Sequence, residues 1–576
     1  MIQKSTLALL LAVFFGTAVL NAQTEIPKGW HLLSPTKDSF YGIDLARAYK
    51  FLADKNKKPK TVIVAVLDSG VDTTHEDLKG ILWHNPKEIP GNGIDDDGNG
   101  YIDDVYGWNF LGGKDGRILK NAGDEKTRVY HRFKDKYLDK QVDTSVMSDD
   151  EKYVYKTWAR SAADINVSPE EQLNVMYVEV AAKGIKKHDK IIRNEMQKEE
   201  YTVAELETYI PTTDSCRKAK LGYLNAMKMF GVESDTKNTD IINELDSYVE
   251  KKKKAIDAKD TPLHDYRADF VKDDYNNIND KFYGNNDVMG GGPMHGTHVT
   301  GIIAAQRNNG IGMDGVADNV KVMTLRVVPD GDEYDKDIAL AIFYAVDNGA
   351  KVINMSFGKA YSPEKRWIDS AVRYAASKDV LLVHAAGNEA SDVDTAQNFP
   401  NASLLKGNKK AENFMTVGAS SDPKINGSFT ASFSNYGKST VDVFAPGVKI
   451  YSTLPGGNQY GNLQGTSMAS PVVTGLAAML RSYYPALSAV QIEEAIERSV
   501  VHPTVDVTVL KPSLEGKKDK ISMTELARFP GCISAYGAVE IADKMKPALN
   551  VTAPTLPIKK QKEILPKQTF KNQKIS

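Results

Sequence analysis

Several short apolar runs, each bounded by charged or turn-forming residues, mark this chain. The first is TVIVAVL at residues 61–67, which is continuous rather than alternating and is followed at once by Asp68. A continuous run rich in β-branched residues is typical of a strand buried on both faces of a parallel sheet. Similar runs predict strands at residues 320–328, 350–355, 380–385 and 415–417, and helical patterns lie between some of them, at 338–348 and 367–377. This alternation predicts an α/β domain with a mostly parallel sheet flanked by helices.

Residues 109–285 have a different pattern, rich in Lys, Glu and Asp and apolar at helical spacing. Ser168 is followed by Pro169 and, three positions on, by Glu171, and Thr202 is followed by Glu205; both patterns are typical of helix N-termini. We therefore predict a large, mainly α-helical insertion that interrupts the α/β domain. Its charge runs fit solvated helix surface, with a binding patch as the alternative.

The two ends of the chain differ from the rest. Lys4, an apolar run at 7–20 and the small residue Ala22 predict a signal peptide at 1–22, and hence export to the extracellular space or the cell envelope. A buried helix or an uncleaved anchor is the alternative, but the run is short for a membrane span. The mature chain is expected to have no transmembrane anchor. Residues 546–576 are rich in Pro and Lys without a clear period, which predicts a flexible tail.

Composition restricts the function only broadly. The chain has 576 residues, 41% of them hydrophobic and 26% charged, and a formal net charge of -2. These values are those of a soluble globular protein of more than one structural unit, and they argue against nucleic acid as a partner. We expect a monomer. The two cysteines, Cys216 and Cys532, are compatible with one disulfide, but their spacing does not show whether they pair.

Three motifs carry candidate chemistry. Asp68 opens DSGVD at the carboxyl end of the first predicted strand, where an aspartate can orient an imidazole or simply form a turn. His295 opens HGTHVTG ahead of an apolar helical run; a metal site formed with His298 is the alternative, although no third ligand stands at a fitting spacing. Ser467 lies in GTSMASP at a predicted helix start, where it either caps the helix or presents a hydroxyl beside free N–H groups.

The order Asp, His, Ser is that of the subtilisin triad. Together, DSGVD, HGTHVTG and GTSMASP resemble the three signature motifs of the subtilase family, over about residues 41–108 and 286–543. The resemblance implies that Ser467 attacks a peptide carbonyl, that His295 is general base and then acid, and that Asp68 fixes its tautomer. The resemblance further implies that Asn388, in AAGNE, donates to the oxyanion.

The resemblance also implies a substrate-binding segment, Ser356-Phe357-Gly358, to which an extended peptide adds as a strand. Phe357 favours a large apolar side chain before the cut. The chain is thus expected to be a secreted serine endopeptidase acting on proteins or peptides, without an organic cofactor. A catalytically silent binding protein with the same fold is the alternative, and a metallohydrolase built on His295 and His298 is a further one. On this reading the domain lies in two parts, 23–108 and 286–545.

An acidic loop predicts a structural calcium site. Residues 95–103 read DDDGNGYID, and oxygen ligands stand at the first, third, fifth and ninth positions of an EF-hand-like loop: Asp95, Asp97, Asn99 and Asp103. Position 12 is Tyr106 rather than Glu, so another ligand is required, and Asp104 is a candidate. Asp77 and the loop at 307–312 resemble parts of a second calcium site common in subtilases.

Overall fold

The computed structural model describes residues 26–230, 232, 234–407, 409–502 and 508–548. The predicted signal peptide and most of the predicted tail lie outside these residues. Within them, no helix has the length and apolar character that a membrane crossing requires. Cys216 and Cys532 are both buried free thiols.

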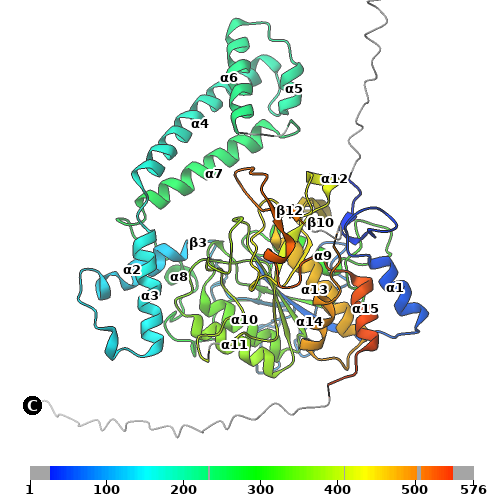
Figure 1. Ribbon diagram of the computed structural model, residues 1–576. Helices are drawn as coiled ribbons and strands as arrows, with labels where there is room; N and C mark the ends of the chain where they lie inside the picture. The colour runs from blue at the N-terminus through cyan, green and yellow to red at the C-terminus, as the bar shows by residue number, and fades with distance from the viewer. Residues whose placement is uncertain (1–25, 231, 233, 408, 503–507, 549–576) are drawn as a thin grey trace, which may run out of the picture.

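A parallel sheet of seven strands forms the centre of the molecule (Figure 1). Each strand is paired in parallel with its neighbours. In spatial order the strands are β2 (Gly107–Asn109), β4 (Val320–Arg326), β1 (Val62–Asp68), β6 (Val352–Met355), β7 (Leu381–Ala385), β8 (Phe414–Ser420) and β9 (Val443–Pro446). The predicted α/β fold is confirmed, and the five predicted strands correspond to β1, β4, β6, β7 and β8.

Apolar layers on both faces of the sheet explain the continuous apolar runs. Along β1, Val64 and Val66 belong to one buried cluster, whereas Ala65 and Leu67 belong to the other. The first cluster is covered by α1 (Leu45–Asp54), α9 (Met294–Ala304), α13 (Thr466–Tyr483), α14 (Ala489–Glu497) and α15 (Ala535–Lys544). The second is covered by α10 (Asp335–Asp347) and α11 (Lys365–Ser377). We call the sheet and these two layers the body.

Short elements complete the body. In the part of the chain that the structure describes, three two-stranded ribbons lie outside the main sheet: β10 (Ile450–Leu454) with β11 (Gln459–Leu463), β12 (Thr508–Leu510) with β13 (Lys520–Ser522), and β3 (Asn121–Gly123) with β5 (Asp330–Gly331). Helical turns are η1 (Trp30–Leu32), η3 (Met523–Glu525) and α12 (Pro423–Asn426). The β3–β5 pair joins the predicted insertion to the loop that follows β4.

The predicted insertion is helical in the structure. Its helices are α2 (Glu125–Tyr137), α3 (Asp149–Asp164), α4 (Pro169–Met196), α5 (Val203–Thr208), α6 (Asp214–Phe230), α7 (Asn238–Asp257) and α8 (Tyr266–Phe270), with the turn η2 (Thr144–Val146). Ser168 caps α4, and Thr202 forms a capping box with Glu205 at α5, as the sequence predicts. Asn109 and Asn285 exchange backbone hydrogen bonds of 2.9 and 3.1 Å, so the two ends of the segment meet.

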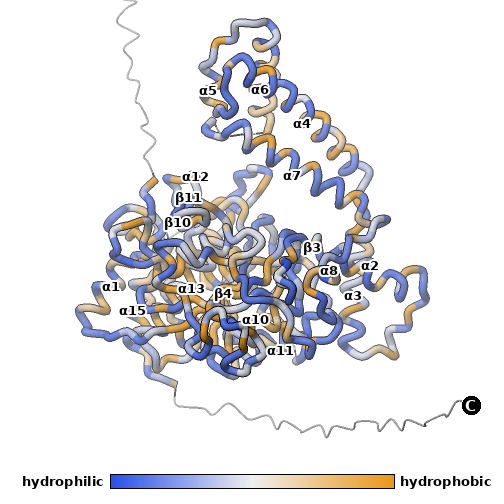
Figure 2. Tube along the Cα trace, turned by 180° about the vertical axis from the view of Figure 1, so that it is seen from behind, coloured by the Kyte–Doolittle hydropathy of each residue, from blue (hydrophilic) through white to orange (hydrophobic). Residues whose placement is uncertain are grey.

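The insertion has two parts with different surroundings. Helices α2, α3 and α8 lie against the body, whereas α4 to α7 project from it and enclose a small core of their own (Figure 1). We call α4 to α7 the arm. Figure 2 shows polar positions interspersed with apolar ones along the arm, in contrast to the apolar interior of the body.

Candidate active site and acidic loop

Asp68 and His295 meet across the whole length of the insertion. Asp68 is the last residue of β1 and is 1% exposed, and His295 lies in the first turn of α9. The Nδ1 atom of His295 lies 2.8 Å from Oδ1 of Asp68. Gly296 permits this approach, because a Cβ there would lie 2.2 Å from the carbonyl oxygen of Gly70. The sequence separation of 227 positions therefore does not keep Asp68 and His295 apart in space.

The surroundings of His295 favour its protonated form. Burial by itself lowers the pKa of the imidazole, but the charge and the hydrogen bond of Asp68, with a smaller contribution from Glu333, outweigh it and raise the pKa above 6.5. His298 behaves differently: burial lowers its pKa to about 4, and its Nε2 lies 3.2 Å from the carbonyl oxygen of Gly461. The two histidines thus face different partners. Among the described residues, the one group of side chains close enough together to hold a metal does not include them.

Ser467 lies in the first turn of α13, joined to the end of β6 by two hydrogen bonds. Its hydroxyl donates to the carbonyl of Ser356 at 3.1 Å, and the hydroxyl of Ser356 donates to the carbonyl of Ser467 at 2.9 Å. Beneath them, Asn354 donates to Ser356 and accepts from Ser470 and Thr474. This buried network fixes the start of α13 to the sheet, because each of these polar groups would be unsatisfied if the elements moved apart.

Asn388 presents its amide beside the same helix start. Its Oδ1 accepts from the backbone N–H of Thr466 at 2.8 Å and from the Thr466 hydroxyl at 3.1 Å, which leaves Nδ2 directed away from Thr466. A Cβ built on Gly465 would lie 3.5 Å from the backbone nitrogen of Ser467 and 3.6 Å from Nδ2 of Asn388. Two amide donors therefore border one small space at the positive end of α13, a position suited to a negative oxygen.

The segment Ser356-Phe357-Gly358 extends β6 beyond the sheet. Gly358 is exposed, whereas Phe357 is 8% exposed and belongs to the core beneath α10 and α11. The carbonyl of Phe357 accepts from Nε2 of His384 at 2.7 Å. Ser356 and Phe357 are thus buried, whereas Gly358, the next residue, is exposed.

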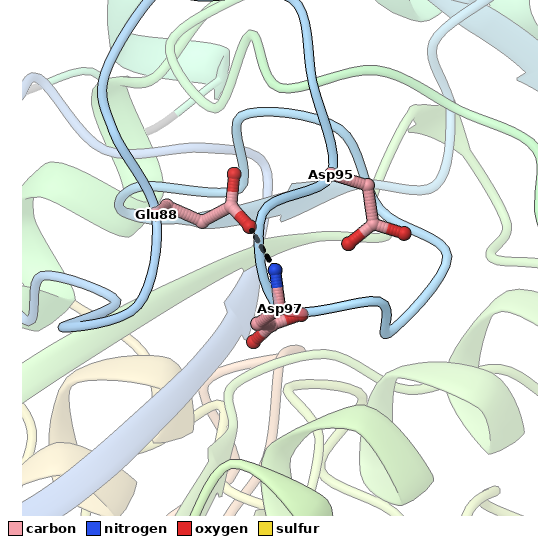
Figure 3. Close-up of side chains that lie close together, drawn as sticks. All are labelled: Glu88, Asp95 and Asp97. Carbon is pink, nitrogen blue, oxygen red and sulfur yellow. Dashed lines mark hydrogen bonds between the residues drawn. The ribbon is translucent and has the colours of Figure 1, made fainter.

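The acidic loop brings together a different set of carboxylates from the one its spacing suggests. Asp95 and Asp97 are grouped with Glu88, with ligand atoms within 4.8 Å of one another (Figure 3). Asp103 instead accepts from the amides of Asn92 and Gly93 at 3.1 and 2.9 Å, and Asn99 accepts from the amide of Tyr101 at 2.7 Å. Burial raises the pKa of Glu88 above its ordinary value. Three converging hard oxygen donors suit a calcium ion.

Glu88 was not identified from the sequence, because it precedes the loop and obeys no ligand spacing. In the structure it accepts from the amides of Asp96 and Asp97 at 3.0 and 3.3 Å, and its other oxygen accepts from the amide of Asp103 at 3.1 Å. The predicted supplementary residue, Asp104, accepts instead from Asn85, Asn99 and the hydroxyl of Tyr344. An acidic residue that satisfies the loop's own amides is a feature visible only in three dimensions.

Asp77 lies in a separate place. It is fully buried, and its carboxylate accepts from the side-chain amide of Asn309 at 2.6 Å, from the amide of Met313 at 3.3 Å and from the hydroxyl of Tyr460 at 3.3 Å. Asp77 therefore contacts the loop at 307–312, the partner that the sequence suggested for it.

Comparison with known proteins identifies the family. The sequence model of the subtilase family matches residues 59–528. The thermophilic serine proteinase of Bacillus sp. (strain AK1) is 40% identical over 246 residues, 42% of this chain and 52% of that protein. The cell wall-associated protease of Bacillus subtilis (strain 168) is 35% identical over 278 residues, 47% and 29% of the two chains. Thermitase of Thermoactinomyces vulgaris is 38% identical over 260 residues, 45% and 79% of the two chains.

The match thus spans about half of the first of these relatives and under a third of the second, but most of thermitase. The matched range contains the strands of the main sheet, the insertion, and helices α9, α10, α11, α13 and α14, whereas α1 and α15 lie outside it. The chain belongs to the subtilase family.

Proposed function

We propose that this protein is a serine endopeptidase in which Ser467, His295 and Asp68 form the catalytic triad and Asn388 completes the oxyanion hole. The observation that carries the proposal is the joint geometry: a 2.8 Å contact from Asp68 to Nδ1 of His295, and two amide donors that border one space beside Ser467. Each motif alone has a simpler explanation as a turn, a metal ligand or a helix cap. The hydrogen bond between Asp68 and His295, together with the packing of α9 against α13, favours acyl transfer.

The proton path follows from these contacts. Because Nδ1 of His295 is held by Asp68, Nε2 is the atom that accepts the hydroxyl proton of Ser467 as its oxygen attacks the peptide carbonyl. The carbonyl oxygen becomes negative and receives hydrogen bonds from the Ser467 amide and the Asn388 side chain. Collapse of this intermediate breaks the C–N bond, and His295 returns its proton to the leaving amine. Water, activated by the same imidazole, then hydrolyses the acyl-enzyme.

The hydroxyl of Ser467 must first turn from the carbonyl of Ser356 towards His295. Such adjustments are common, because catalytic hydrogen bonds often tighten only when substrate binds. An extended peptide pairing with Ser356 and Gly358 would fill the space in front of Ser467 and favour this turn. Polypeptides are therefore the proposed substrates. We also propose that the protein acts as a monomer and is exported from the cell.

Replacement of Ser467 by Ala tests the proposal. We expect wild-type protein to react covalently with a fluorophosphonate probe and to cleave peptides, and Ser467→Ala to lose the labelling and about 10⁴-fold or more in kcat. Ser377→Ala, an exposed serine at the end of α11, is the matched control and should keep both. Absence of labelling and cleavage in folded wild-type protein would favour the alternative, a silent binding protein.

We further propose that Glu88, Asp95 and Asp97 bind a structural calcium ion. Members of the subtilase family generally bind such ions, and these carboxylates offer oxygen atoms within 4.8 Å of one another. The ion would neutralise converging negative charge and fix the loop to the body. Asp77 and Asp103 lie outside this group of carboxylates, whereas Asn99 adjoins it, because its backbone amide donates to Asp95 and Asp97 at 3.1 and 3.0 Å.

Thermal denaturation with and without calcium tests this site independently of activity. Calcium at 1 mM is expected to raise the midpoint by several degrees in the wild type, since a ligand that binds only the folded state stabilises it. Asp97→Asn should abolish most of this shift. Asp96→Asn, which removes the same charge from the same loop but lies outside the group, should retain it. Equal shifts in all three proteins would refute the site.

A further inference from the structure

The segment after β6 offers a free backbone edge of limited length. The N–H and C=O of Lys359 pair with Phe399 at 3.0 and 2.9 Å, and the C=O of Phe357 accepts from His384 on the same side. Because peptide groups alternate along an extended chain, those of Ser356 and Gly358 face the other way. Within the described residues, neither the N–H nor the C=O of Gly358 has a hydrogen-bond partner. In the same part of the chain, the carbonyl of Ser356 accepts a hydrogen bond only from the hydroxyl of Ser467.

Helix α3 of the insertion hydrogen-bonds to the backbone that follows this free edge. The chain bends at Ala360, whose carbonyl accepts a hydrogen bond from the guanidinium of Arg160 on α3. The carbonyl of Ser362 accepts from the hydroxyl of Tyr153, on the same helix, at 3.1 Å. Arg160 also lies over the ring of Tyr361, 4.2 Å from its centroid. Helix α3 thus engages the carbonyls of Ala360 and Ser362, backbone acceptors that follow Gly358, while Ala360 itself stays exposed.

The start of α2 fixes this arrangement from below. Glu125 and Lys359 are nearly fully buried and lie 3.2 Å apart, and Lys359 also contacts Asp335 at 2.7 Å and donates to the carbonyl of Glu333 at 2.6 Å. Arg128 pairs with Glu125 and donates to the same carbonyl. Removing one member of such a buried ionic cluster leaves an uncompensated charge, so the cluster resists separation. The insertion is therefore held firmly against the peptide edge.

We call α2, α3 and α8, the helices of the insertion that lie against the body, the base of the insertion. We propose that this base is a specificity element that limits the acyl side of the substrate groove to about three residues. This inference rests on the proposed function. A peptide that pairs in antiparallel fashion with Ser356 and Gly358 uses its first and third residues before the scissile bond. Its fourth residue meets Arg160 and Ala360 and must leave the edge. Cleavage is thereby directed to sites near the amino-terminal end of the substrate, or to a substrate segment that can turn sharply.

A ladder of acylated peptide substrates tests the inference on the full-length protein. The peptides share one leaving group and have one to six residues before the cut. We expect kcat/KM to rise steeply up to three residues and to stay level, within about twofold, from three to six. A further rise of tenfold or more between three and five residues would refute the limit, since it would show backbone or side-chain contacts beyond Gly358.

Arg160→Ala is designed to extend the edge by freeing the carbonyl of Ala360. We expect the ratio of kcat/KM for five-residue and three-residue peptides to increase at least fivefold. Arg217→Ala, an arginine on α6 of the arm whose side chain is 64% exposed, is the matched control and should leave the ratio unchanged. An unchanged ratio in folded Arg160→Ala would also refute the proposal.

If Arg160→Ala does not fold, Tyr153→Phe removes only the hydroxyl that caps Ser362 and is expected to increase the same ratio by about twofold. Labelling of Ser467 by a fluorophosphonate is measured in parallel in every variant. Loss of labelling in the wild type would refute the proposed peptidase function itself. Normal labelling, with a five-residue to three-residue ratio of kcat/KM that does not change in the α3 variants, would refute only the limit on groove length.

Discussion

The body and the arm are both α-helical at their surfaces, but they are stabilised differently. In the body, the central strands and helices α9 and α13 consist almost entirely of buried residues. The arm has one small core, and α4 exposes an apolar stripe of Leu173, Met176, Tyr177 and Val180, each between 44% and 63% exposed. From this difference we expect two roles: the body holds the proposed reacting groups in place, and the arm adds surface without taking part in that positioning.

The base of the insertion belongs with the body in this comparison. Arg267 of α8 pairs with Asp337 at 2.7 Å and with Asp273 at 2.8 Å, all of them buried, and Lys336 contacts Asp273 at 2.6 Å. These bonds join α8 to the start of α10. Changes in α2, α3 or α8 should therefore act on the body, and changes in the arm should not.

The largest expected effect is confined to the body. Asp68→Asn should lower kcat by about 10³–10⁴-fold, because an amide cannot hold Nδ1–H of His295 in the required tautomer. Asp246→Asn, the same substitution at a half-exposed site in the arm, should have no measurable effect. Steady-state kinetics on a short peptide measures both. A comparable loss in the arm variant would contradict the separation of tasks.

Paired core truncations compare the regions at equal chemistry. Ile353 in β6 and Ile192 in α4 are both 0% exposed, and replacing either by Ala should cost about 2–5 kcal/mol of local stability. Ile353→Ala should lower the midpoint of thermal unfolding of the whole body. Ile192→Ala should speed hydrogen exchange in the arm and leave short-peptide kcat/KM within about twofold. Equal loss of activity in both would show that the arm is coupled to the site.

The pH dependence of kcat/KM is expected to follow the ionisation of His295. Its pKa is raised by Asp68, and the general base must be neutral, so kcat/KM should fall as the pH drops through a value above 6.5. Asp68→Asn removes the charge that raises this pKa, and the acid limb should move to lower pH. A limb that stays in place in the variant would mean that another group controls it.

Sequence patterns found the parts of this site that depend on local structure. A continuous apolar strand ends at Asp68, glycine and small residues surround His295, and Ser168 and Thr202 cap helices, so each is readable within a few residues. Other contacts could not be predicted, because no sequence spacing relates the segments that they join. These are the contacts between Glu88 and the acidic loop, between Lys359 and Glu125, and between Arg160 and Ala360. Phe357 shows the same limit: its apolar character is visible in sequence, but the side on which it is buried depends on α10 and α11.

The smallest expected effect concerns a cavity of about 590 Å³ in the body, lined in part by Asp442, Glu493 and Glu497. Burial, together with the charge of Asp442, raises the pKa of Glu493 to about 9, well above the 4.5 of an unfolded chain. A folded-state pKa raised in this way contributes stability that is present below pH 4.5 and is lost as the pH rises towards 9.

Glu493→Gln keeps the shape of this side chain and removes its titration. The thermal midpoint of the variant minus that of the wild type should therefore become more positive between pH 5 and pH 9, by several degrees. Glu494→Gln, on the same helix and half-exposed, is the matched control and should show no such trend. A flat difference for Glu493→Gln would mean that its carboxyl ionises at ordinary pH, and hence that the cavity admits water freely. In that case the body would resemble the arm at this one place, with a solvated acidic surface where the structure has a buried one.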